Sequence, residues 1–304
     1  MKKFELTAEF VTNVFGMKLF RIKALVAFGN VEKGELGGFI EKEDNLSHDG
    51  DAWVYGNALV SGDARVSGDA RVYGNARVFG NALVSGNALV YGDAEVSGNA
   101  WVYGNAWVYG NALVYGDARV SGNARVFGDA RVSGDARVSG NAWVYGNAEV
   151  YGNALVYGDA EVSGDARVYG NAWVYGNARV SGNARVYGNA LVSGDARVSG
   201  DARVYGNARV FGDARVSGDA RVSGDADYAV VEGFGRYFRA TTFFRCKDKI
   251  LRVQCGCFYG DLAQFREIVK KTHGDSKYAK EYLAIADLME LHFSDEEENP
   301  EAAE

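Results

Sequence analysis

Proline is nearly absent from this sequence of 304 residues, which has one proline beside 40 glycines. A collagen-like chain and a proline-rich disordered chain both need many prolines, so both are excluded, and the glycines indicate turns that recur at fixed intervals. Cysteine is also scarce. All three cysteines follow residue 245, which fits a reducing compartment better than a framework of disulfides.

Long apolar runs are missing as well. No stretch approaches the roughly 18 apolar residues of a membrane span. The opening "MKKFELTAEF" has Glu5 and Glu9 where a signal peptide needs an apolar run. We therefore expect a cytoplasmic protein without a membrane partner.

The negative charge is concentrated at one end of the chain. The formal net charge is -7 at pH 7, and the last ten residues, "DEEENPEAAE", contain six acidic side chains. Such a composition predicts that residues 294–304 form a disordered acidic tail. The rest of the chain is close to neutral, so we expect no duplex nucleic acid as a partner.

More than half of the sequence consists of a repeat of six residues. Every sixth residue from Val54 to Val222 is valine, in 29 hexads of the form Ala-x-Val-(Tyr/Ser/Phe)-Gly-(Asn/Asp). In extended chain Ala and Val point to one side, while x and the Tyr/Ser position point to the other. The Gly-Asn or Gly-Asp pair then turns the chain. Three hexads close one coil of 18 residues, which predicts a parallel β-helix of about ten triangular coils, about 45 Å long, with Val and Ala inside.

Both ends leave this period, as capping of the open coil edges requires. We predict an N-terminal β capping module (1–50), the hexapeptide β-helix (51–226) and a C-terminal α+β module (227–293). The first contains a hairpin, "KFELTAEF" and "KLFRIKAL", across Gly16. The last contains two strands around residues 247–249 and two amphipathic helices, capped by Asp261 and by Asp275 or Ser276.

The three sides of the predicted helix carry different outward residues. On the first side, which contains Val54, an aromatic column is followed by serines at 163, 181, 199 and 217. Its candidate binding residues are Tyr55, Tyr73, Tyr91, Tyr109, Phe127 and Tyr145, with Trp53, Trp107 and Trp143 at neighbouring x positions. Six aromatic side chains in register indicate stacked rings, which either cover the sheet or form an interface between copies of the chain.

The second side, which contains Val60, has a second column near its C-terminal end. Its candidate binding residues are Tyr151, Tyr169, Tyr187 and Tyr205, beside Arg167, Arg185, Arg203 and Arg221. Most arginines of the repeat belong to an Asp-Ala-Arg triplet, which predicts neutralisation by the nearby carboxylate. The alternative is binding of phosphate or a nucleotide, with Tyr169, Tyr187 and Tyr205 as stacking platforms.

Catalytic residue types are missing from the repeat. Residues 51–226 contain no His, Lys or Cys, so no pair of nucleophile and base can be drawn there. The aspartates occupy turn positions where Asn also occurs, and His48 precedes the first hexad and is expected to be structural. Cys255 and Cys257 lie on an apolar strand face with Leu251 and Val253, which predicts core thiols. We expect no metal and no cofactor.

The pattern "V-Y-G-N-A-x" resembles the hexapeptide repeat of left-handed parallel β-helices. The resemblance covers more than half of the chain. It implies left-handed winding, and it favours a homo-oligomer, a trimer above others. The best-known relatives are acyltransferases that use a His general base and a projecting loop, both of which this repeat lacks. The two end segments resemble those of uncharacterised bacterial and phage-borne hexapeptide-repeat proteins.

The sequence therefore predicts a non-catalytic structural or interaction protein that presents flat β-helix faces for self-association or partner binding. One alternative is a phage-type counter-defence protein that sequesters a nucleotide signal or a host protein. Another is a hexapeptide-repeat acyltransferase.

Overall fold

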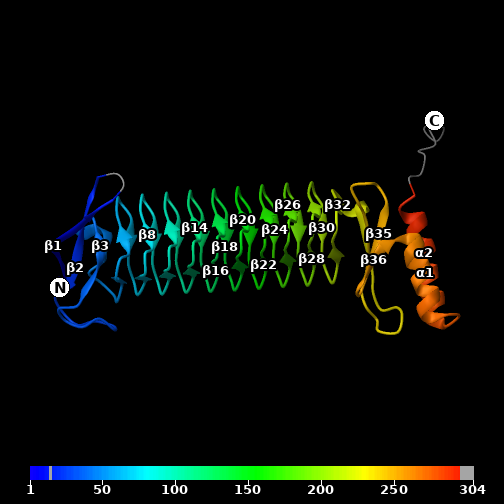
Figure 1. The fold of residues 1–304 in the computed structure, drawn as a ribbon, viewed down its shortest axis with the longest axis horizontal. Coiled ribbons are helices and arrows are strands. Elements are labelled where there is room, and N and C mark those ends of the chain that lie inside the picture. The colour runs from blue at the N-terminus through cyan, green and yellow to red at the C-terminus, as the bar shows by residue number, and fades with distance from the viewer. Residues whose placement is uncertain (14–15, 295–304) are drawn as a thin grey trace, which may run out of the picture.

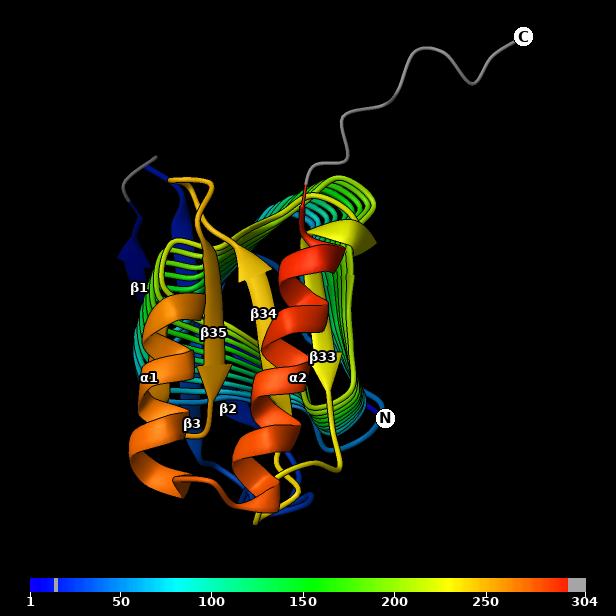
Figure 2. The same cartoon turned by 90° about the vertical axis from the view of Figure 1, so that its right-hand side faces the viewer.

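The computed structural model describes residues 1–13 and 16–294, and it is an elongated prism with a cap at each end (Figure 1). The prism is a parallel β-helix of about ten coils, as predicted. Strands one coil apart pair in parallel with Val opposite Val, for example Val120, Val138 and Val156. In the view of Figure 2 the coils superpose into one outline behind the C-terminal cap.

Each strand of the solenoid is an x-Val pair, and the strands form three sheets. The first side consists of β4 (Trp53–Val54), β7 (Arg71–Val72), β10 (Leu89–Val90), β13 (Trp107–Val108), β16 (Arg125–Val126), β19 (Trp143–Val144), β22 (Glu161–Val162), β25 (Arg179–Val180), β28 (Arg197–Val198) and β31 (Arg215–Val216). The second side continues from the N-terminal cap through β5 (Leu59–Val60), β8 (Arg77–Val78), β11 (Glu95–Val96), β14 (Leu113–Val114), β17 (Arg131–Val132), β20 (Glu149–Val150), β23 (Arg167–Val168), β26 (Arg185–Val186), β29 (Arg203–Val204) and β32 (Arg221–Val222). The third side consists of β6 (Arg65–Val66), β9 (Leu83–Val84), β12 (Trp101–Val102), β15 (Arg119–Val120), β18 (Arg137–Val138), β21 (Leu155–Val156), β24 (Trp173–Val174), β27 (Leu191–Val192) and β30 (Arg209–Val210).

The core of the solenoid is formed by the repeated valines and alanines. Every hexad Val from Val54 to Val222 and every hexad Ala from Ala52 to Ala220 is fully buried. Backbone hydrogen bonds join successive coils at three positions of the hexad. Examples are Trp107 N to Ala124 O (2.9 Å), Tyr109 N to Val126 O (3.0 Å) and Asn111 N to Gly128 O (2.8 Å). The buried backbone is therefore paired along the axis, which a solenoid requires.

The corners of the prism depend on glycine. Each corner glycine from Gly50 to Gly218 has φ between +59° and +75°, which is left-handed backbone that glycine adopts without a steric cost. At Gly140 an added Cβ would lie 2.8 Å from the backbone nitrogen of Gly158 in the next coil. Side chains are therefore excluded at this position both by φ and by the close approach of the coils.

The asparagines at the corners form ladders that the sequence analysis did not anticipate. The amide of Asn105 donates to Asn123 (3.1 Å), Asn123 donates to Asn141 (3.0 Å), and Asn141 donates to Asp159 (2.9 Å). An Asp carboxylate accepts but cannot donate, so it ends a ladder. Asn and Asp are therefore equivalent as turn formers but not as links between coils.

Replacing Asn123 by Asp is expected to interrupt this ladder, because the carboxylate cannot donate to Asn141. We expect Asn123→Asp to lower the free energy of unfolding by about 0.5–1 kcal/mol, measured by urea denaturation. Asn57→Asp is the matched control, since Asn57 is a corner residue that makes no side-chain hydrogen bond in the described chain. Equal losses in the two variants would contradict a role for the ladder.

The N-terminal cap begins with the predicted hairpin. Strand β1 (Phe4–Thr12) pairs antiparallel with β2 (Lys18–Ala24), which pairs antiparallel with β3 (Leu36–Ile40). Strand β3 then pairs in parallel with β5, so the cap extends the second side. The register of β1 shifts between Leu6 and Phe10, which marks a bulge, and a bulge on an outer strand opposes edge-to-edge pairing.

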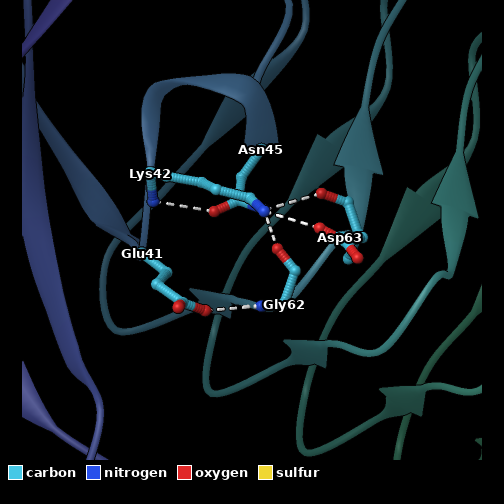
Figure 3. A network of polar contacts seen from close by, with 6 residues as sticks. Glu41, Lys42, Asn45, Gly62 and Asp63 are labelled. Carbon is cyan, nitrogen blue, oxygen red and sulfur yellow. Dashed lines mark hydrogen bonds and ion pairs between the residues drawn. The ribbon is translucent and has the colours of Figure 1, made fainter.

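A polar network centred on the buried Asn45 attaches the cap to the first corner of the second side (Figure 3). Asn45, in the 3₁₀ turn Glu43–Asn45, is fully buried, and its amide donates to the carbonyls of Gly62 (3.0 Å) and Ala64 (2.8 Å). Its Oδ1 accepts from the backbone N–H of Lys42 (2.9 Å), and the Lys42 ammonium pairs with Asp63 (2.6 Å). The network satisfies carbonyls that lack an earlier coil to pair with.

The C-terminal cap is an antiparallel sheet covered by two helices on its outer face (Figure 2). After the 3₁₀ turn Asp225–Asp227, the strands are β33 (Tyr228–Val231), β34 (Thr241–Arg245), β35 (Leu251–Cys255) and β36 (Phe258–Asp261), and the helices are α1 (Leu262–His273) and α2 (Lys277–His292). Asp261 and Ser276 cap the helices, as predicted. The sequence reading missed β33 and β36, because neither strand has a long period-2 pattern.

Both faces of this small sheet are buried. Tyr228, Phe244 and Cys246 belong to the solenoid core, whereas Phe243 and Val253 pack against the helices. The sheet therefore closes the last coils and joins them to α1 and α2. The predicted acidic tail lies outside the described residues, apart from Ser294.

Candidate functional site

The aromatic column of the first side is a continuous stack of parallel rings. Parallel register places outward side chains 18 residues apart directly above one another, one coil apart. The centroids of successive rings are 4.8–5.0 Å apart and their planes differ by 0–3°. The stack comprises Tyr73, Tyr91, Tyr109, Phe127 and Tyr145. Burial raises the pKa of Tyr73, Tyr91 and Tyr109, in agreement with half-covered rings.

Trp53 and Tyr55, which were predicted to belong to the aromatic surface of the first side, are not part of the ring stack. Trp53 is 0% exposed, and its ring makes edge contacts with Phe4 (6.2 Å) and Phe28 (5.4 Å) of the N-terminal cap. Tyr55 packs against the same core, and the ring stack begins one coil later. The expectation that Trp53 is outward and exposed is therefore wrong. The covering residues come from a segment without a repeat, so the hexad pattern could not reveal them.

The tryptophans of the first side hold an arginine between them. Trp107, Arg125 and Trp143 occupy the same x position in successive coils. The Arg125 guanidinium lies 4.6 Å from the ring centroid of Trp107 and 5.2 Å from that of Trp143. This cation–π arrangement rigidifies the face while Trp143 stays 38% exposed. The Arg125 guanidinium thus packs against both tryptophan rings.

The second column has the predicted register, and its inner rings, Tyr169 and Tyr187, have no open faces. Tyr151, Tyr169, Tyr187 and Tyr205 are spaced 4.8–5.2 Å apart with planes within 9° of parallel. Each inner ring is therefore covered on both faces by its neighbours. A nucleobase cannot stack on Tyr169 or Tyr187 without separating the coils, so the predicted stacking platform is not available there.

The arginines of the solenoid do not pair with the aspartates of their own triplets. Within residues 51–226 no Asp-Ala-Arg triplet forms an ion pair within 4.0 Å, so any neutralisation within a triplet acts without direct contact. The pKa of Asp63 is lowered first by Lys42 and also by Arg65 of its own triplet. The arginines that do pair reach a glutamate one coil away. Arg77 pairs with Glu95 (3.5 Å), Arg167 with Glu149 (3.3 Å) and Arg179 with Glu161 (3.5 Å). Asp165 and Asp201 instead accept from the amides of Asn147 and Asn183.

The arginine row borders a groove at the C-terminal end of the second side. Its volume is about 480 Å³. It is lined by Arg167, Arg185, Arg203, Arg221 and Lys247 and by Asp165, Asn183, Asp201 and Asp219. Lys247 comes from the turn between β34 and β35, and its backbone N–H donates to the carbonyl of Asp219 (3.1 Å). The sequence reading missed Lys247, because only the docking of the cap brings it beside the repeat.

His48 and Cys246 have the surroundings of structural residues. His48 stacks on Phe4 (4.4 Å), and its Nε2 lies 2.6 Å from the Glu43 carboxylate, whose pKa this contact lowers. Burial raises the pKa of Cys246. Cys257 is exposed, so its predicted place in the core is wrong. Among the described residues no group of three potential ligands is placed to hold a metal ion.

The geometry defines a class of protein: a capped β-solenoid repeat protein whose outward residues form columns along the axis. A comparison with family profiles gives the more specific assignment. The chain belongs to the family described as the YdcK β-solenoid repeat, whose matches together cover about half of its length. The matches span residues 52–68, 64–80, 70–86, 76–92, 94–110, 118–134, 130–146, 160–176, 174–186, 178–194, 184–200, 202–218 and 214–226.

Most of these matches are 17 residues long, close to one coil, so the family unit corresponds to one turn of the solenoid. A comparison with curated proteins gave no match. Within the described part of the chain, no helix is long and apolar enough to cross a membrane.

Proposed function

We propose that the protein is a non-catalytic interaction protein that self-associates through the ring column of the first side. The observation that supports this most directly is the flat, stacked surface from Tyr73 to Tyr145, flanked by Trp107 and the exposed Trp143. Stacked rings held by their neighbours present a continuous row of ring edges at little further cost in conformational entropy, which favours them as interface residues.

Charge favours a second copy of the chain as the occupant of this face. Between Arg71 and Trp143 the x positions of the first side carry only two arginines, and Arg125 is held between tryptophans. Two such faces can meet without strong repulsion. By contrast, the arginine row of the second side would repel a second copy of itself.

Catalysis by the solenoid has little chemical support. The uninterrupted hexads carry no histidine, lysine or cysteine between residues 51 and 226, so an acyltransferase mechanism lacks its base there. The covered rings of Tyr169 and Tyr187 also weaken the nucleotide-sequestration alternative. The interaction role is therefore the function that the geometry supports best.

Self-association is tested by light scattering on the purified protein. We expect a multiple of the 32.8 kDa chain mass for the unmodified protein and the monomer mass for Trp107→Glu with Tyr109→Glu, because two carboxylates would be buried unpaired in the interface. The matched control is Trp173→Glu with Tyr175→Glu, the same triplet on the third side, which should keep the native mass. A monomeric native protein, or equal dissociation of both variants, would refute the proposal.

A further inference from the structure

The arginine row of the second side is the longest run of arginine at the x positions of the solenoid. Shorter runs occur on the first side, with Arg179, Arg197 and Arg215, and on the third side, with Arg119 and Arg137. From β23 to β32 four consecutive coils carry Arg opposite Arg. Like charges in register destabilise a sheet, so this row is unfavourable until anions occupy it.

Three of the cations on this groove have no partner among the described residues. Arg167 pairs with Glu149, and Arg221 donates to the carbonyls of Asp201 (3.1 Å) and Ala220 (2.9 Å). Arg185, Arg203 and the Lys247 ammonium make no ion pair or side-chain hydrogen bond within residues 1–13 and 16–294. Their charges face the groove, with Arg185 and Arg203 only partly exposed.

The lining of the groove also contains carboxylates that can accept hydrogen bonds. Asp165 and Asp201 each accept one amide hydrogen bond from an asparagine, and a carboxylate has room for several. A ligand in the groove therefore meets both guanidinium donors and carboxylate acceptors. It needs both negative groups and hydroxyl donors, arranged along one line.

We propose that this groove binds an extended acidic polysaccharide, a polymer of uronic acids, lying parallel to the solenoid axis. The rings of the adjacent Tyr column show that successive coils are about 4.8–5.2 Å apart, so the row from Arg167 to Arg221 spans about 15 Å. An extended uronic acid chain with twofold symmetry presents a carboxylate to one side at every second sugar, an interval close to two coils. Guanidinium forks suit carboxylates, and the sugar hydroxyls can donate to the aspartates.

Other polyanions fit the groove less well. Inorganic polyphosphate carries a denser negative charge and no hydroxyl groups along its chain, so it would face Asp165, Asp201 and Asp219 with no donor for them. A single-stranded nucleic acid depends on stacking of several bases, and the faces of Tyr169 and Tyr187 are covered by their neighbours. The proposal concerns the second side and does not depend on self-association through the first.

Binding of a short oligogalacturonate to the full-length protein, measured by calorimetry at low salt, tests this assignment. We expect one class of sites whose affinity falls as NaCl is added. Arg185→Glu with Arg203→Glu should weaken binding at least about tenfold, and Arg185→Gln with Arg203→Gln should weaken it less, because it removes charge without reversing it. A neutral oligogalactan should not bind.

The matched control is Arg65→Glu with Arg137→Glu, two exposed arginines of the third side, which should bind as the native protein does. Circular dichroism must show the native spectrum for every variant that is compared. Absence of binding by the native protein, or equal affinity in the groove and control variants, would overturn the site. Tighter binding of polyphosphate or oligothymidylate than of the uronate would overturn the polysaccharide assignment.

Discussion

Val138→Asp is expected to unfold the middle of the solenoid. Val138 is fully buried and stacks between Val120 and Val156, so a carboxylate there would have no water and no cation. An unpaired buried charge belongs to the small class of substitutions that cost more than about 4–5 kcal/mol. We expect insoluble protein or loss of the β-sheet circular dichroism signal well below the native melting temperature.

The neighbouring residue supplies the control for this substitution. Arg137 is adjacent to Val138 in β18 but points outward and is exposed. Arg137→Asp introduces the same side chain at the same height and should change the free energy of unfolding by no more than about 0.5 kcal/mol. If both variants melted alike, the inward direction of the valine column would be refuted.

Loss of the C-terminal cap is expected to turn a discrete protein into large end-to-end assemblies. A chain truncated after residue 226 would lack the sheet that buries Phe244 and Thr242 against the last coils. The exposed end would present unpaired backbone and valine side chains, which match the requirements for adding another chain. Size-exclusion chromatography with light scattering should show material in the void volume.

A point substitution tests the contact between the cap and the solenoid core without removing the cap. Phe244→Asp places a carboxylate between the cap and the solenoid core and should give the same assemblies. Phe238→Asp is the matched control, because Phe238 is in the same cap but 72% exposed. Discrete, native-sized Phe244→Asp protein would show that the cap is not what prevents end-to-end association.

Most of the fold was predictable from the repeat, because every hexad has the same inward and turn-forming residues and therefore adopts the same conformation. Val and Ala two residues apart fix the inward face, and Gly fixes the corner, so the coil, the sides and the stacked columns follow from the sequence alone. The register of Tyr73 over Tyr91 and of Arg185 over Arg203 was predictable for this reason. The left-handed sense of winding came only from the resemblance and remains an expectation.

The parts that were not predictable involve contacts between periodic and non-periodic segments. Trp53 looks like any other tryptophan of the repeat, and only the docking of Phe4 and Phe28 buries it. Lys247 joins the arginine groove because a cap turn lies against Asp219. Arginines pair with a glutamate one coil away and not with an aspartate two residues away. This preference depends on side-chain direction, which spacing along the sequence does not predict.

Each coil of the solenoid contains three hexads, and this determines how the length of the protein can change. Insertion or removal of 18 residues would lengthen or shorten the rod by one coil and leave both end modules facing as before. Insertion of a single hexad would add only one side, so the C-terminal sheet and its helices would be rotated by about a third of a turn relative to the N-terminal hairpin. Lys247 would then lie over a different side, away from the arginines. Whole-coil changes thus preserve the alignment between the ends, whereas hexad changes reorient them.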